Sequence, residues 1–205
     1  MTDAALSYLA LGDSYTIGEG VAEDARWPAR LATELRRVRV PLAEPRILAR
    51  TGWTTDELSA AMDAEEPLGQ WDFVSLLIGV NNQYRGRPVE EYARAFAALL
   101  ARALKLAGGR ADRVLVLSIP DWGVTPFAAA EGRDRARIAQ ELDAYNAAAR
   151  ATCALRQVAF VDITGVSRAL GGAPSMLAAD GLHPSAAMHA EWAALALPVA
   201  RRLLQ

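Results

Sequence analysis

The stretch FVSLLIG, Phe73–Gly79, decides the fold because it is a continuous apolar run that ends at a glycine. A second run of this kind is VLVLSIP, at Val114–Pro120. Strands of a parallel sheet are covered on both faces, so they show continuous apolar runs and little alternation. The two stretches therefore predict buried strands of a parallel sheet.

Strand and helix patterns alternate outward from these two runs. The predicted strands are Ser7–Leu11, Arg46–Ala49, Asp72–Ile78, Arg113–Ile119 and Gln157–Val161. Helical spacing of apolar residues, with capping residues and stop signals, predicts helices between and after them: Arg26–Arg39, one opened by Thr54–Glu57, Pro88–Gly109, Arg133–Arg156, and Pro184–Leu204 with a kink or early end at Pro198. This alternation predicts a three-layer α/β/α fold with a parallel sheet and right-handed crossovers. The length of 205 residues favours one domain over residues 1–205.

Composition and charge exclude several classes of protein. The chain is 52% hydrophobic and 22% charged, as in a soluble globular protein. Its formal charge of −2 gives no electrostatic footprint for nucleic acid or for an anionic membrane. No run approaches 18 uninterrupted apolar residues, and the N-terminus lacks the basic region of a signal peptide. We therefore expect a cytoplasmic protein without a membrane span.

Cysteine and histidine are too sparse for a dedicated metal site. Cys153 is the only cysteine, so an intrachain disulfide is impossible, and its alanine-rich helical context predicts a buried, inert thiol. His183 and His189 are six residues apart, which places them on different faces of a helix. We expect no metal and no cofactor.

Polar residues follow the predicted strands at the points where chemistry collects in such sheets, at the carboxyl ends. Ser14 follows the first strand in YLALGDSYTIGEG (Tyr8–Gly20), Gly52 follows the second and Asn81 the third. Asp180 and His183 lie three residues apart in a loop beyond the fifth strand. These residues are expected at one edge of the sheet.

Their chemistry is that of acyl transfer. Ser14 supplies a hydroxyl nucleophile, His183 a base, and Asp180 a carboxylate that fixes the tautomer of the base. The backbone N–H groups of Ser14 and Gly52 and the side-chain amide of Asn81 supply donors for an oxyanion. Pro184, as the expected first residue of the last helix, places His183 beside a helix N-terminus, which disfavours the imidazolium form.

The four stretches resemble the SGNH/GDSL hydrolase family, which is named for blocks containing Ser, Gly, Asn and His. GDSY at Gly12–Tyr15 resembles the first block, Gly52 the second, GVNN at Gly79–Asn82 the third and DGLHP at Asp180–Pro184 the last. The resemblance implies a flavodoxin-like fold with five parallel strands, and hydrolysis of esters or thioesters without a cofactor. Asn82 is a departure, because the third block of the family usually ends in aspartate.

Several nearby residues have simpler interpretations. Asp13 is expected to bond backbone in the turn, Asp162 is a rival to Asp180 as the orienting carboxylate, and His189 is expected to be exposed on the last helix. Loop residues on the same side are candidates for substrate contact: Trp53, Tyr84, Arg85, Arg87, Trp122 and Phe127. The two tryptophans suit a place capping the core equally well, and solvated arginines are favoured over arginines that bind an anion.

The motifs of the chain also bear on other classes of function. A nucleotide or flavin site is disfavoured, because the first loop matches neither G-x-G-x-x-G nor the phosphate loop G-x-x-x-x-G-K-S/T. The α/β-hydrolase elbow G-x-S-x-G is absent too, since Thr16 takes its last position. An acyltransferase that uses the same serine, and an inactive relative that binds esters or glycans, stay open. The expected partner is a small acyl ester; its acyl and alcohol groups, and the oligomeric state, are left open.

Overall fold

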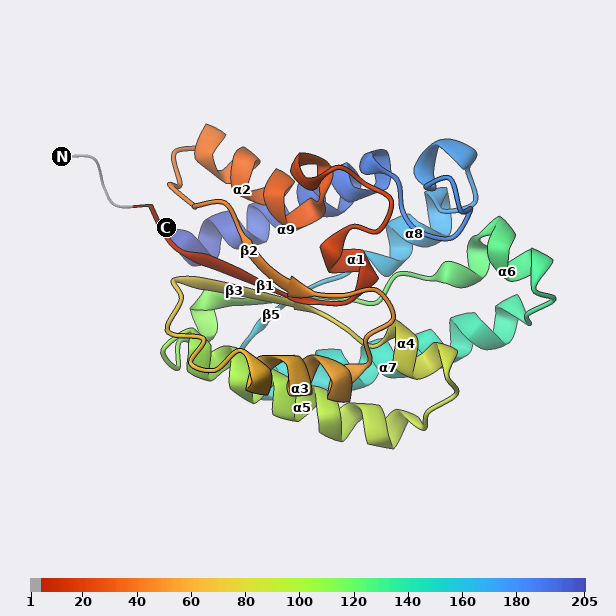
Figure 1. Ribbon diagram of the computed structural model, residues 1–205, viewed down its shortest axis with the longest axis horizontal. Helices are drawn as coiled ribbons and strands as arrows, with labels where there is room; N and C mark the ends of the chain where they lie inside the picture. Colours follow the sequence, from red (N-terminus) through yellow and green to blue (C-terminus); the bar gives the residue numbers. More distant parts are fainter. Residues whose placement is uncertain (1–4) are drawn as a thin grey trace.

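The computed structural model describes residues 5–205, which are built around a sheet of five parallel strands (Figure 1). The strand order is β2-β1-β3-β4-β5, so that β1 lies between β2 and β3. The strands are β1 (Tyr8–Gly12), β2 (Arg46–Ala49), β3 (Phe73–Leu77), β4 (Val114–Leu117) and β5 (Ala159–Val161). The predicted strands and the parallel α/β fold are confirmed, with shifts of one or two residues at most of the strand ends.

Helices cover both faces of this sheet, which gives three layers (Figure 1). Helices α2 (Trp27–Arg37) and α9 (Ala186–Leu204) pack together on one face, while α5 (Val89–Leu106) packs against α3 (Thr55–Ala64) and α7 (Arg135–Leu155) on the other. The shorter helices are α1 (Ser14–Ile17), α4 (Val80–Tyr84), α6 (Pro126–Ala130) and α8 (Thr164–Leu170). Four 3-10 helices complete the set within residues 5–205: η1 (Glu23–Ala25), η2 (Ala111–Arg113), η3 (Trp122–Val124) and η4 (Pro174–Met176).

The apolar runs form strands because both faces of the sheet are covered. All five residues of β3 and all four of β4 are buried. Tyr8, on the neighbouring β1, is also buried, and its hydroxyl pairs with that of Ser75 at 2.9 Å. Burying the polar Ser75 is therefore compatible with a central strand, because its hydroxyl has a partner.

Helices α4 and α9 differ from the pattern expected from sequence, and the short helices α1, α6 and α8 were not expected from it. Residues 80–84, expected to be loop, form α4, and α9 begins at Ala186 with Ser185 as its N-cap. Pro184 instead pairs with Leu177 in a short antiparallel bridge, so it lies outside the helix. Helix α9 continues through Pro198 to Leu204 without being shortened. No helix among residues 5–205 has both the length and the apolar character needed to cross a membrane.

The prediction that His189 is exposed is wrong. Its side chain is completely buried, and Nδ1 accepts a hydrogen bond of 3.1 Å from the backbone N–H of Trp27, across the contact between α2 and α9. The ring also packs edge-on against Trp192, with centroids 5.1 Å apart. Burial lowers the pKa of His189 to about 3, so the ring is neutral at physiological pH. Cys153 is buried as predicted, and burial raises the pKa of its thiol to about 12.

Candidate active site

The topology brings three of the candidate residues to one edge of the sheet. Ser14 follows β1, Gly52 follows β2 and Asn81 follows β3. Because these strands are parallel and β1 lies between the other two, their carboxyl ends are neighbours. The prediction that these residues share an edge agrees with this strand order.

Ser14 is the first residue of α1, and Asp13 is its N-cap. The Asp13 carboxylate accepts a hydrogen bond of 3.0 Å from the backbone N–H of Tyr15, which is the backbone bond expected of Asp13. Asp13 is fully buried, and within residues 5–205 its Oδ2 has no hydrogen-bond partner. Burial raises the pKa of Asp13 to about 7, although backbone hydrogen bonds to the carboxylate act in the opposite direction. The turn therefore holds a costly buried carboxyl group directly before Ser14.

Asp180 and His183 lie in a small hairpin. Its two arms are joined by hydrogen bonds from the backbone N–H of Ala178 to the carbonyl of His183, 2.7 Å, and from the N–H of Ser185 to the carbonyl of Met176, 2.9 Å. Gly181, at the tip, has a φ of 68°, a left-handed conformation that favours glycine. The hairpin thus fixes the backbone on both sides of the two side chains.

The carboxylate of Asp180 holds the ring of His183. Asp180 Oδ2 lies 2.5 Å from His183 Nδ1, and Oδ1 accepts bonds of 2.9 Å from the backbone N–H groups of Leu182 and His183. Partial burial acts to raise the pKa of Asp180, but the hydrogen bonds from His183 and the backbone outweigh it, and the pKa lies below its usual value. Asp180 is therefore ionised near neutral pH, and the ring of His183 is held in place.

The hairpin lies beside the Ser14 turn. The ring of Tyr15, the residue after Ser14, is 6.4 Å from the ring of His183, measured between centroids. Asp162, the rival carboxylate, is used elsewhere: it accepts from the backbone N–H of Thr164 at 2.9 Å and pairs with Arg150 at 3.2 Å. Of the two carboxylates, Asp180 is the one that contacts a histidine.

The other two candidate donors are positioned by neighbouring groups. Asn81 Nδ2 donates to the carbonyl of Trp53 at 2.9 Å, which ties α4 to the turn that contains Gly52. Gly52 has a φ of 87°, a conformation that side chains with a Cβ rarely adopt. Arg85 donates to the carbonyl of Gly52 at 2.8 Å and pairs with Glu57 at 3.3 Å. Its guanidinium thus supports the turn, in addition to any contact with substrate.

Asn82 has a structural role that the sequence did not reveal. Its side chain is completely buried; Oδ1 accepts from the backbone N–H of Thr55 at 3.0 Å, and Nδ2 donates to the hydroxyl of Thr55 at 2.8 Å. These two bonds join the beginning of α4 to the beginning of α3. The departure from the usual aspartate therefore lies at the junction that places Asn81 relative to Gly52.

The remaining candidates for substrate contact differ in their accessibility. Trp122 is buried and donates to Gln83 at 2.8 Å, whereas Tyr84 is 40% exposed and packs against Trp122 with ring centroids 5.2 Å apart. Phe127 also lies near this cluster, 6.5 Å from Trp122 between ring centroids. Arg87 pairs with Asp56 at 2.5 Å and is thus occupied by a carboxylate of the protein. Tyr84 is the most accessible aromatic residue of the cluster.

Metal-binding groups are not gathered in the described part of the chain. Within residues 5–205, no three side chains of His, Cys, Asp or Glu are placed to share a metal ion.

Comparison with known proteins identifies the family. The model of the GDSL-like Lipase/Acylhydrolase family matches residues 10–191. No curated protein matches the chain significantly. Among solved structures, TesA is 20% identical with a TM-score of 0.74 and covers 97% of this chain and 99% of its own. The lipase/acylhydrolase from Enterococcus faecalis is 16% identical with a TM-score of 0.72, covering 98% and 97%. Axe2, an acetylxylan esterase from Geobacillus stearothermophilus, is 20% identical with a TM-score of 0.71, covering 98% and 96%.

At these identities the solved structures establish the fold, and the family match spans the residues from β1 to α9. The match includes Ser14, Gly52, Asn81, Asp180 and His183. The chain therefore belongs to the GDSL-like Lipase/Acylhydrolase family, a family of hydrolases that act on ester bonds.

Proposed function

We propose that this protein is a serine hydrolase that cleaves carboxylic esters or thioesters through an acyl-enzyme on Ser14. The observation that carries the proposal is the pair of Asp180 and His183, 2.5 Å apart, in a hairpin beside the Ser14 turn. An imidazole held at Nδ1 by an ionised carboxylate presents Nε2 as a base, as acyl transfer from a serine requires. The names of the similar structures, a lipase/acylhydrolase and an acetylxylan esterase, support an ester as substrate.

The first half of the reaction acylates Ser14. His183 Nε2 takes the proton of the Ser14 hydroxyl while Oγ bonds to the carbonyl carbon of the ester. The oxyanion that forms is stabilised by the backbone N–H groups of Ser14 and Gly52 and by the amide of Asn81, each donor contributing roughly 3–4 kcal/mol to the transition state. The intermediate then expels the alcohol or thiol, which receives the proton from His183.

The second half releases the acid. A water molecule gives a proton to His183 Nε2 and attacks the acyl carbon, and the bond from carbon to Ser14 Oγ breaks as the proton returns to the serine. Asp180 stays ionised throughout and stabilises the imidazolium that forms in both halves. Its lowered pKa suits this role, because the carboxylate stays charged at the pH at which the imidazole works.

The proposal is tested by hydrolysis of p-nitrophenyl esters and by labelling with a fluorophosphonate. Wild-type protein is expected to turn over these esters and to gain one covalent adduct on Ser14, located by peptide mass spectrometry. Both Ser14→Ala and His183→Ala are expected to lose at least 10³-fold in kcat while keeping the far-UV circular dichroism of the wild type. Ser59→Ala, a serine on α3, is the matched control and should keep full activity.

Different outcomes would contradict the mechanism and the function. Esterase activity that survives in Ser14→Ala, or an adduct on another residue, contradicts the mechanism. Folded wild-type protein that neither hydrolyses esters and thioesters nor takes up the fluorophosphonate contradicts the proposed function.

A further inference from the structure

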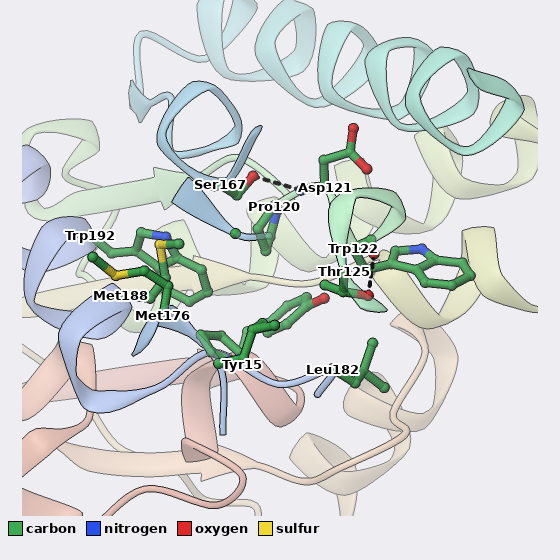
Figure 2. A pocket seen from close by; sticks show the side chains of 13 residues that line it. Tyr15, Pro120, Asp121, Trp122, Thr125, Ser167, Met176, Leu182, Met188 and Trp192 are labelled. Atoms are coloured by element: carbon green, nitrogen blue, oxygen red, sulfur yellow. Dashed lines mark hydrogen bonds between the residues drawn. The ribbon is translucent and has the colours of Figure 1, made fainter. Parts of the chain in front are cut away.

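A narrow apolar pocket lies between the end of β4, helix α8 and the beginning of α9 (Figure 2). Its cavity volume is about 20 Å³, which leaves room for roughly one methyl-sized group. Figure 2 shows Met176, Met188 and Trp192 at one end of the pocket, with Trp122 and Leu182 at the other. The two methionines belong to η4 and α9, so this end of the pocket is made by flexible side chains from separate elements.

The pocket borders the proposed catalytic groups. Tyr15, which directly follows Ser14, lines it, and so do Leu182 and Pro184, which flank His183. The ring of Tyr15 is 6.4 Å from the ring of His183 and 5.8 Å from that of Trp192, measured between centroids. The pocket is thus lined in part by residues adjacent in sequence to Ser14 and His183.

Three polar side chains of the lining, Ser167, Thr125 and Asp121, are engaged with the protein, whereas Nε1 of Trp192 is buried without a hydrogen-bond partner among residues 5–205. The Ser167 hydroxyl donates to the carbonyl of Thr164 at 2.7 Å and accepts from the N–H of Asp121 at 2.8 Å. The Thr125 hydroxyl donates to the carbonyl of Trp122 at 2.7 Å, and the carboxylate of Asp121 pairs with Arg168 at 2.8 Å. Groups that are paired in this way do not recruit a sugar hydroxyl or a charged substituent, whereas an alkyl chain needs no hydrogen-bond partner.

Resting on the proposed function, we propose that this pocket receives the acyl group and restricts the enzyme to acetyl esters, because it has room for about one methyl group. Met176, Met188 and Trp192 close the end that a longer chain would need to enter. Such a chain would have to displace side chains from a packed site, and each added methylene that does not fit costs about 10-fold or more in kcat/KM.

The test is the chain-length profile of kcat/KM for p-nitrophenyl acetate, butyrate, hexanoate and octanoate. Wild-type protein is expected to prefer acetate and to lose at least 10-fold in kcat/KM between acetate and butyrate. Met188→Ala and Met176→Ala open the closed end, and each should raise the octanoate-to-acetate ratio at least 10-fold. Met176, on η4, is only half-buried, so its variant serves where the buried Met188→Ala folds poorly.

Met62→Ala is the matched control, because it removes the same side chain from a fully buried place on α3. It should leave the chain-length profile unchanged even if it lowers stability. A wild-type preference for butyrate or a longer acyl chain, or profiles unaltered by both methionine substitutions, overturns the proposal while the serine mechanism stands. If wild-type protein shows no hydrolysis that depends on Ser14, the proposed function itself is overturned, and the acyl-pocket proposal falls with it.

Discussion

Asp180 forms three hydrogen bonds in one small loop, and they make its replacement by asparagine informative. The backbone N–H groups of Leu182 and His183 both donate to Oδ1, so an asparagine would keep its oxygen there and turn its NH₂ group toward His183 Nδ1. That arrangement forces the proton of a neutral imidazole onto Nε2. In this tautomer His183 cannot accept the proton of Ser14.

Asp180→Asn should therefore lower kcat by about 10⁴-fold while the hairpin keeps its shape. The measurement is steady-state hydrolysis of p-nitrophenyl acetate, with thermal unfolding as the check on folding. Asp162→Asn is the matched control and should stay within about twofold of the wild type, since Asp162 contacts Arg150 and Thr164 instead of a histidine. An inactive Asp162→Asn beside an active Asp180→Asn would reassign the orienting carboxylate.

At the scale of elements, Asn82 is the connection between α4 and α3. It joins the N-termini of the two helices through two buried hydrogen bonds to Thr55. Asn82→Leu removes both and leaves the N–H and hydroxyl of Thr55 without partners, at a cost of about 1–3 kcal/mol in the free energy of unfolding. Because Asn81 is the neighbouring residue of α4, kcat should fall as well.

The conservative partner is Asn82→Asp, which restores the residue usual at this position of the motif. A carboxylate still accepts from the Thr55 N–H, and the hydroxyl of Thr55 can turn to donate to it. It should keep stability within about 1 kcal/mol of the wild type and retain activity; urea unfolding and p-nitrophenyl acetate kinetics measure both. Equal losses in Asn82→Leu and Asn82→Asp would show that the amide itself is required.

The elements also show what the sequence can and cannot predict. The central strands were predictable because burial on both faces makes β1, β3 and β4 continuous apolar runs, whereas the edge strands β2 and β5 are only partly buried. Helix α4 was not, because VNNQY is short and carries no apolar periodicity. The start of α9 was misplaced because Pro184 suits a first helical position, whereas its bridge to Leu177 holds it outside the helix.

The candidate site, too, was predictable from the sequence only in part. The order of Ser14, Gly52, Asn81, Asp180 and His183 along the chain, with parallel strands, was enough to expect them at one edge. The roles of Asn82 and Arg85 depend on contacts between distant segments, which no local pattern reveals. The burial of His189 did have a signal: it shares a helical stripe with Ala193, Ala196 and Ala200, all of them buried.

At the scale of the whole molecule, two buried titratable groups act on stability in opposite directions. Asp13 has a pKa of about 7 in the folded state against 3.8 for the ordinary group. The folded state therefore holds more protons than the unfolded state between these values, and the contribution of Asp13 to stability is lost as the pH rises through this window. Asp13→Asn removes the ionisable group, so its stability relative to the wild type should increase from pH 4.5 to pH 7.

For a single such group, the difference in unfolding free energy between Asp13→Asn and wild type changes by at most about 1.4 kcal/mol per pH unit. Urea unfolding of Asp13→Asn and wild type at half-unit intervals of pH measures it. A difference between the two proteins that stays constant from pH 4.5 to pH 7 contradicts the proposed burial of an acid with a raised pKa.

His189 changes the stability of the fold with pH in the opposite direction to Asp13. Its pKa falls from 6.5 in the ordinary group to about 3 in the folded protein, so the unfolded state binds the extra proton, and stability is lost as the pH falls below about 6.5. His189→Asn keeps an acceptor near the N–H of Trp27 but cannot titrate; it should be less stable at pH 7 and lose this pH dependence.

Between pH 4.5 and pH 6.5 the contributions of Asp13 and His189 to the pH dependence of stability oppose each other. The wild type should therefore change little there, Asp13→Asn should gain stability with rising pH, and His189→Asn should lose it. A His189→Asn protein whose unfolding free energy rises with pH across this window would contradict the assignment of that slope to His189.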